Sequence, residues 1–290
     1  MSDNPHHDEI TGVDTTGHVW DGIKELNNPL PRWWLWTFYI TIIWGIGYTI
    51  AYPAWPMVER ATGGLLGQNT RADVAADIAA VEAQNAEVSA TLASADLNTL
   101  AQSDPAFSLG VAGGAAVFRA NCSQCHGAGA AGVQAAGYPN LLDDAWLWGG
   151  TLDAIEYTVR HGIRNEQDFD ARWSEMPAYD EVLSEDEIVA TAQYVRSLSG
   201  ADHDATLASA GAEIFAGECS SCHGDAGMGD PELGAPNLTD AIWLYGGSQE
   251  KIVETITYSR FGVMPAWGQR LSEAEVKAVT LYVHQLGGGE

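Results

Sequence analysis

The pentapeptide CSQCH at residues 122–126 occurs again, with one substitution, as CSSCH at residues 219–223, and the two copies use all four cysteines of the 290-residue chain. Two thiols three positions apart can each form a thioether with a vinyl group on one edge of a porphyrin, which leaves the adjacent histidine under the iron. The pattern therefore predicts two haem c groups. Their expected attachment sites are Cys122, Cys125, Cys219 and Cys222, and their expected proximal iron ligands are His126 and His223.

A C-x-x-C pair also occurs in redox dithiols and in zinc sites. A redox dithiol is typical of a βαβ pattern, and a structural zinc site needs a second pair of Cys or His ligands. Neither context accompanies either copy in this sequence. Haem is also favoured because both copies lie inside a longer repeat.

The repeat aligns the two copies at an offset of 97 positions through their first halves and of 88 positions afterwards. The offset changes because the first copy holds nine extra residues around Arg164 to Arg172. A period this long with only two copies indicates a duplicated domain and not a solenoid. The matched segments include Pro139-Asn140-Leu141 with Pro236-Asn237-Leu238, WLWGG at 146–150 with WLYGG at 243–247, and LSEDEI at 183–188 with LSEAEV at 271–276.

Each copy is predicted to form a helix that ends at the pentapeptide, a Gly/Pro-rich loop, a middle helix, a Met-Pro loop and a final helix. The final helices begin with capping boxes, Ser184 with Glu187 and Ser272 with Glu275. Gly114 and Gly211 are expected to let the first and last helices cross closely. The order of elements resembles a class I cytochrome c domain, so we expect tandem domains of this class at residues 112–200 and 208–290, and a mainly α fold.

The second axial ligand of each iron must come from a distant loop, and Met176 and Met264 are the candidates. They occupy matched positions of the repeat, and each precedes a proline, which disfavours helix and presents the methionine from an extended Met loop. A thioether favours ferrous iron, so His/Met ligation raises the reduction potential and leaves no open position for substrate. The predicted chemistry is outer-sphere electron transfer. Loop length makes pairing within each repeat the default, but an exchange of the two Met loops between packed domains stays open.

Other residues are expected to shape the haem environment. The matched prolines and the aromatic Trp-Leu segments should wall the haem crevices and exclude water, which also tunes the reduction potential. A tryptophan N–H or a nearby cation could in addition contact the haem propionates. These candidates are Pro139, Pro236, Trp146, Trp243, Arg160 and His161.

The N-terminal part of the chain predicts a membrane anchor. Trp33 to Tyr52 is a run without formal charges, rich in Ile and aromatic residues, and as a helix it would be about 30 Å long, matching a bilayer core. With tryptophans and tyrosine at both interfaces, we expect a single transmembrane helix within residues 33–55. Residues 1–32 are expected to hold a short amphipathic helix at the membrane surface, and the Ala-rich residues 56–111 a helical linker.

The charge balance restricts the partners of the chain. With 13 basic against 39 acidic residues, the formal net charge is −26, which would repel nucleic acid and attract basic proteins. Because covalent haem c is attached on the outer side of an energy-transducing membrane, the domains after the anchor should be periplasmic. The N-terminus should then be cytoplasmic, and the chain should contact the lipid of a bacterial inner membrane.

The stretch TGHVWDGIKELNNPLPRWW at residues 16–34, the span ending in AYPAWP at 51–56, the Ala-rich linker and the two CxxCH units resemble the CcoP (FixP) family of cbb3-type cytochrome c oxidase subunits. The N-terminal stretch is the specific part, because many proteins share tandem cytochrome c domains. The resemblance implies an inner-membrane complex with a catalytic haem–copper subunit and a monohaem cytochrome subunit, which reduces O2 to water and pumps protons. It implies that this chain accepts electrons from a donor cytochrome c and passes them inward, without an oxygen site of its own.

Two other classes of function stay open from the residues alone. The chain would be a free-standing, membrane-tethered dihaem carrier if it served another enzyme. A dihaem peroxidase would need one iron with a vacant or displaceable site, and the presence of Met176 and Met264 disfavours it.

Overall fold

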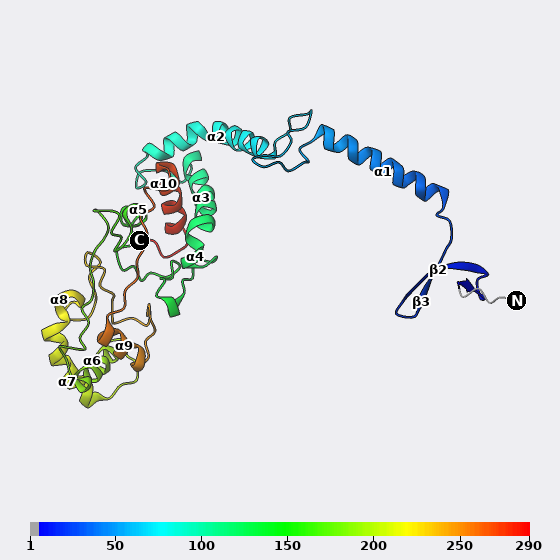
Figure 1. Cartoon of the computed structure of the whole chain (residues 1–290). Coiled ribbons are helices and arrows are strands. Elements are labelled where there is room, and N and C mark those ends of the chain that lie inside the picture. Colours follow the sequence, from blue (N-terminus) through cyan, green and yellow to red (C-terminus); the bar gives the residue numbers. More distant parts are fainter. Residues whose placement is uncertain (1–5) are drawn as a thin grey trace. The chain divides into compact units, whose positions relative to one another are not determined.

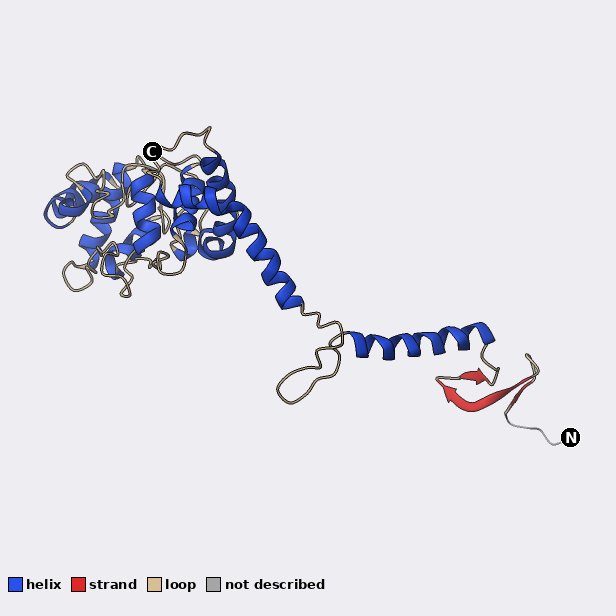
Figure 2. Ribbon diagram, turned by 90° about the horizontal axis from the view of Figure 1, so that it is seen from above, coloured by secondary structure: helices blue, strands red, loops and turns tan. Residues whose placement is uncertain are grey.

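The computed structural model describes residues 6–290 and is mostly helical (Figures 1 and 2). The first five residues of the predicted cytoplasmic segment lie outside the described residues. The chain divides into two compact units, an N-terminal unit that ends at Ala83 and a C-terminal unit that begins at Gln84.

The N-terminal unit begins with an antiparallel sheet and not with the predicted amphipathic helix. Its strands β1 (His7–Asp8), β2 (Val13–Trp20) and β3 (Ile23–Leu26) lie in the order β1-β2-β3. Strands β2 and β3 form a hairpin around Asp21 (φ 49°) and Gly22 (φ 87°). Asp-Gly favours a two-residue hairpin turn with positive φ at both positions, and this local preference outweighs a helical spacing of only three apolar residues. The helix prediction for this segment is therefore wrong.

Helix α1 (Arg32–Ala51) is the predicted membrane anchor. Its mean hydropathy of 1.3 and its length are sufficient to cross a membrane, and none of its residues is buried in the described chain. The helix ends four residues before the predicted boundary, because Tyr52 precedes Pro53 and takes an extended conformation (φ −114°, ψ 161°).

Helix α2 (Thr70–Ser94) forms most of the predicted linker, and α3 (Pro105–Val117) begins inside it. Leu92 near the end of α2 and Leu97 after it are buried together with side chains of α3 and of α10 (Glu273–His284). The last part of the linker is thus a portion of the helical core, and the first helix of the repeat begins before residue 112.

The C-terminal unit holds two helical bodies. The outer body takes its helices from the two ends of the repeat region and the inner body takes them from its middle, so each body combines helices of both predicted domains. In the outer body, α10, drawn in red, packs against α3, drawn in green, and against α5 (Figure 1). In the inner body, α6 packs against α7 and α9. The outer body comprises α3, the π turn η1 (Phe118–Cys122), α4 (Ser123–His126), the short 3-10 helix η2 (Gln134–Ala136), α5 (Leu152–His161) and α10; the inner body comprises α6 (Glu185–Leu198), α7 (Ala205–Glu218), α8 (Ser220–His223) and α9 (Gln249–Tyr258).

Buried side chains confirm this exchange of the final helices. Both cores combine an aromatic residue before the pentapeptide and the middle helix of one repeat with the last helix of the other. The outer core contains Phe118, Ile155 and Val159 with Val276, Val279 and Val283. The inner core contains Phe215, Ile252 and Ile256 with Ile188, Ala192 and Val195.

Close helix crossings occur at the two predicted glycines. A Cβ at Gly114 would overlap the carbonyl of Ala278 in α10, and a Cβ at Gly211 would overlap the carbonyl of Ala190 in α6. Both capping boxes also form at the starts of α6 and α10. The predicted local features are therefore present, while each first helix crosses the final helix of the opposite repeat.

The two bodies meet through matched aromatic contacts. A Cβ at Gly137 would overlap the ring of Tyr245, and a Cβ at Gly234, the matched residue of the second copy, would overlap the ring of Trp148. Both glycines have positive φ, 70° and 60°. A larger residue would be strained and would also separate the bodies, so the sequence requires glycine at these turns.

Candidate haem sites

The first candidate site is a cavity of about 480 Å³ in the outer body. Cys122, Cys125 and His126 line it together with Met264. Most of the remaining lining is apolar, including Phe118 and the tryptophans of the WLWGG segment. Two thiols, an imidazole and a thioether around an apolar space fit a covalently bound porphyrin with an iron at its centre.

The proximal histidines have the same environment in both bodies. The Nδ1 of His126 lies 3.2 Å from the carbonyl oxygen of Pro139, and the Nδ1 of His223 lies 3.2 Å from that of Pro236. A carbonyl only accepts, so each Nδ1 carries the proton and each Nε2 keeps a free lone pair for a metal. Burial lowers the pKa of both imidazoles, which favours this neutral form.

The carbonyl partners were expected only as walls of the crevice. Their orienting role could have been predicted from one signal, because each proline stands 13 positions after its histidine. Because proline has no backbone N–H, its carbonyl is the only backbone group that can form a hydrogen bond at each of these positions.

Backbone hydrogen bonds hold the second Met loop on the outer body. Met264 and Ile163 exchange two bonds, with N···O distances of 2.9 and 3.0 Å, directly after α5. Further along, the N–H of Trp267 donates to the carbonyl of Val159 over 3.0 Å. Met264 is therefore placed at the first pentapeptide, although it follows the second in sequence.

The first Met loop is held on the inner body in the matching way. The N–H of Tyr179 donates to the carbonyl of Ile256 over 3.1 Å, and the hydroxyl of Ser259 donates to the carbonyl of Met176. The Tyr179 hydroxyl donates to the carbonyl of Glu218, next to the second pentapeptide, over 2.8 Å. Met176 and Cys219 pack against the same hydrophobic core.

The two Met loops are therefore exchanged between the repeats. Met264 lies with Cys122, Cys125 and His126, and Met176 lies in the body that holds the second pentapeptide. The default of pairing within each repeat does not occur in the structure.

The cysteines do not have the character of a redox dithiol. All four are free, and burial raises the pKa of Cys122 to about 11 and that of Cys219 to about 11. A reactive dithiol is instead characterised by a lowered thiol pKa. This environment supports the preference for haem over redox chemistry at the thiols.

The two cations expected near the propionates have other partners. Arg160 binds Glu156 over 2.8 Å and Glu273 over 2.6 Å. The Nδ1 of His161 lies 3.2 Å from the carboxylate of Asp168. Neither Arg160 nor His161 lines the cavity of about 480 Å³. The indole N–H of Trp146 donates to the carbonyl of Gly288.

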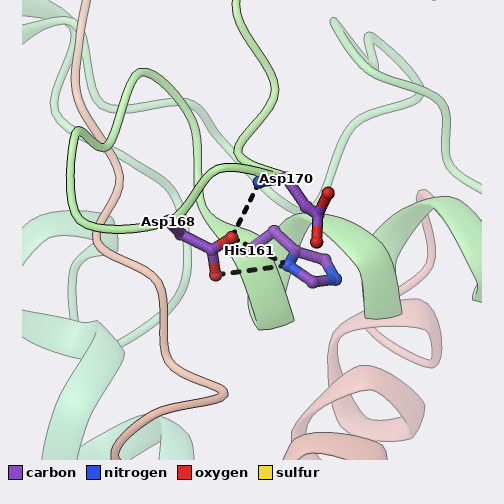
Figure 3. Close-up of side chains that lie close together, drawn as sticks. All are labelled: His161, Asp168 and Asp170. Atoms are coloured by element: carbon purple, nitrogen blue, oxygen red, sulfur yellow. Dashed lines mark hydrogen bonds and ion pairs between the residues drawn. The ribbon is translucent and has the colours of Figure 1, made fainter.

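Figure 3 shows His161 with two carboxylates of the extra residues in the first repeat, Asp168 and Asp170. Their ligand atoms lie within 4.8 Å of one another. Asp168 accepts the N–H of Asp170 over 2.9 Å as well as the imidazole contact, and these bonds lower its pKa. The contacts fold the inserted loop back on to the end of α5.

Two other arginines line the first cavity, Arg164 and Arg270. Arg270 is exposed and stacks on Trp267, at 5.4 Å from the ring centroid. Arg164 is partly buried and belongs to the nine extra residues of the first repeat. Sequence reasoning did not select Arg164, because a residue without a counterpart in the other copy has no matched position to support it.

Two family models match the chain. The model described as the N-terminal domain of cytochrome oxidase-cbb3, FixP, matches residues 12–59. The model described as cytochrome c oxidase, cbb3-type, subunit III, matches residues 110–195 and 206–283. Together they cover the anchor region and both copies of the repeat.

Similar proteins extend over the full chain. The cbb3-type cytochrome c oxidase subunit CcoP of Cereibacter sphaeroides is 54% identical over 292 residues, which cover 100% of both chains. The corresponding subunit FixP of Azorhizobium caulinodans is 53% identical over 293 residues, covering 100% of this chain and 99% of the relative.

Proposed function

Since the chain belongs to the CcoP/FixP family of cbb3-type cytochrome c oxidase subunits, we propose that it is the subunit through which electrons enter the oxidase, on two haem c groups. Members of this family are electron-transfer subunits of the oxidase, and this chain is one of them. The shared cavity of Met264 and the first pentapeptide carries the proposal, because it brings the candidate ligands of one iron into a single apolar space.

Each haem would be held by residues from both repeats. Cys122, Cys125, His126 and Met264 would hold the first haem. Cys219, Cys222, His223 and Met176 would hold the second. A bound haem c supplies a one-electron Fe(III)/Fe(II) couple.

The chain's own residues set the conditions for that couple. The Pro139 and Pro236 carbonyls orient the two imidazoles through Nδ1 and leave Nε2 for the metal. The methionine thioethers would favour the reduced metal and would leave it no open position for a substrate. Apolar walls exclude water and keep the change in solvation during electron transfer small.

The length and apolar composition of α1 support a membrane anchor, and the expected attachment of haem c outside the membrane supports its orientation. This helix would anchor the chain in the bacterial inner membrane, with the N-terminal hairpin in the cytoplasm and the two bodies in the periplasm. The bodies would then take electrons from a donor cytochrome c and pass them to the monohaem and haem–copper subunits. The net charge of −26 supports a basic donor.

The test is purification of the complex from its native membrane in a mild detergent. We expect haem b, copper and oxygen uptake to travel with the chain, and two covalently bound haem c groups on the chain itself. Reduced-minus-oxidised spectra, metal analysis and oxygen consumption measure these quantities. A lone c-type spectrum after gentle extraction would contradict the oxidase role and support a free-standing carrier.

A further inference from the structure

Arg164 places a cation in the wall of the first haem cavity. It lines the same space as His126 and Met264 and directly follows Ile163, the backbone partner of Met264. Its φ of 51° is unusual for a residue with a side chain. The surrounding contacts therefore hold Arg164 in a conformation that an unconstrained loop would avoid.

The guanidinium is fixed by neutral groups only. Its Nε donates to the carbonyl of Ser174 over 2.6 Å, and its Nη1 donates to the carbonyl of Gly262 over 2.9 Å. The ring of Phe261 lies below it, with 5.4 Å between Cζ and the ring centroid. Among residues 6–290 no carboxylate forms an ion pair with Arg164. Burial lowers its pKa, and the charge of Glu175, which forms no ion pair with Arg164, acts in the opposite direction.

Other arginines near the two sites are satisfied differently. Arg260 forms an ion pair with Glu254, at 3.3 Å, and stacks on Tyr245. Arg172 of the first repeat stacks on Tyr157 and does not line the cavity. Arg164 has no counterpart in the second repeat, because it lies within the nine extra residues of the first.

A cation in an apolar cavity is costly unless an anion accompanies it. Haem c brings two propionate carboxylates, and a planar guanidinium with unused N–H groups can bind a carboxylate through two parallel hydrogen bonds. We propose that Arg164 is the counter-charge of a propionate on the haem attached at Cys122 and Cys125, and that it raises the reduction potential of this haem only. The inference rests on the proposed haem attachment.

The sign follows from electrostatics. Oxidation leaves one more positive charge on the iron, and a nearby cation destabilises that state. Pairing of a propionate also removes a negative charge that would stabilise ferric iron. Since the second site lacks this residue, Arg164 contributes to an asymmetry between the two sites, and it favours the first haem as the electron acceptor within the chain.

The experiment is a spectroelectrochemical redox titration of the full-length chain with both haems. Arg164→Gln should lower one midpoint potential and leave the other unchanged, and Arg164→Lys, which keeps the charge, should retain most of the original value. Arg119→Gln is the matched control, because Arg119 is exposed, lies three positions before Cys122 and does not line the cavity. We expect it to leave both midpoints in place.

The affected haem is identified with Met264→Leu. In that background, adding Arg164→Gln should move only the midpoint that Met264→Leu has already lowered. The proposal is overturned if Arg164→Gln moves neither midpoint, moves the other one, or has no larger effect than Arg119→Gln. If the glutamine variant does not accumulate, the propionate bending band in the resonance Raman spectrum of Arg164→Lys decides, because loss of the paired hydrogen bonds should shift it. A chain without c-type haem would overturn the proposed function instead.

Discussion

The methionine side chains have little freedom at either site, because backbone hydrogen bonds hold both Met loops at the end of a middle helix. Met264 exchanges two bonds with Ile163, and the Met176 carbonyl accepts a hydroxyl proton from Ser259. Each histidine is likewise held by a proline carbonyl. At the scale of single residues, the histidine and the Met loop proposed for each iron are thus held by groups that would not themselves touch it.

Replacing one methionine should change one haem. We expect Met264→Leu to lower the midpoint potential of a single haem and to remove its methionine-to-iron charge-transfer absorption, because a soft ligand is lost. Met176→Leu should affect the other haem, which makes it the matched control. Redox titration and absorption spectra check this, and unchanged titrations for both variants would refute the ligand assignment.

The candidate haem-attachment residues can be proposed from the sequence alone, because thioether attachment depends on local spacing within a pentapeptide. The sequence could not predict which of Met176 and Met264 lies in the body of which pentapeptide. The two copies have similar core residues and similar Met loops, so either final helix fits either body at the level of residue type. The sequence also could not show that Arg164 lines the first cavity, because the fold of an insertion sets its position and the other repeat has no matching residue.

At the scale of helices, one close crossing is central to the outer body. The outer body depends on the approach of α3 to α10 at Gly114, where no room exists for a Cβ, whereas a Cβ at the neighbouring Gly113 would meet nothing within 4 Å. The two adjacent glycines thus have different roles in one helix.

Alanine at these two glycines should have opposite effects on stability. Gly114→Ala should reduce the free energy of unfolding of the outer body by about 1–3 kcal/mol through overpacking. Gly113→Ala should increase it by roughly 0.5–1 kcal/mol, because alanine costs less backbone entropy in a helix. Urea unfolding followed by circular dichroism measures both. Equal effects of the two variants would contradict the close crossing.

An ion pair also joins elements of different repeats. Arg160 of α5 binds Glu273 at the start of α10, and the hydrogen bonds from Arg160 hold the pKa of Glu273 below its ordinary value of 4.5. A carboxylate with a lowered folded-state pKa contributes stability above the unfolded-state pKa. That contribution is lost as the pH falls through the lowered value.

Glu273→Gln should therefore destabilise the protein by about 0.2–1 kcal/mol at pH 7, the range for exposed ion pairs. The difference from the unmodified chain should shrink as the pH falls through the lowered pKa of Glu273 and its carboxylate becomes protonated. Urea midpoints measured from pH 7 to pH 3 test this. Glu185→Gln, at the matched position of α6, is the control, and a difference that persists at low pH would contradict the expected linkage.

Some helices could be predicted from the sequence, whereas the N-terminal hairpin and the start of α3 could not. Capping boxes and the apolar run revealed α6, α10 and α1, because these signals lie within one helix. The hairpin of β2 and β3 was missed because a three-residue apolar spacing was given more weight than the turn signal of Asp21-Gly22. The start of α3 was also missed, since an Ala-rich linker and an Ala-rich helix have the same composition.

The whole C-terminal unit is a nested structure. The inner body comes from the middle of the repeat region, and the outer body from its two ends, so the chain passes from the outer body to the inner one and back. This nesting makes the two candidate haem sites interdependent, because each one contains a methionine from the repeat that holds the other pentapeptide. Sequence order alone predicts sequential domains and gives no signal for such an exchange.

The most direct test of the nested arrangement is a cut between the repeats. A specific protease site inserted in the exposed loop at residues 202–204 would allow the haem-loaded chain to be cleaved, and the fragments to be separated in increasing urea. We predict that the methionine-to-iron absorption of both haems disappears at the urea concentration at which the fragments separate. Separated fragments that each keep this absorption would contradict the exchange of the Met loops.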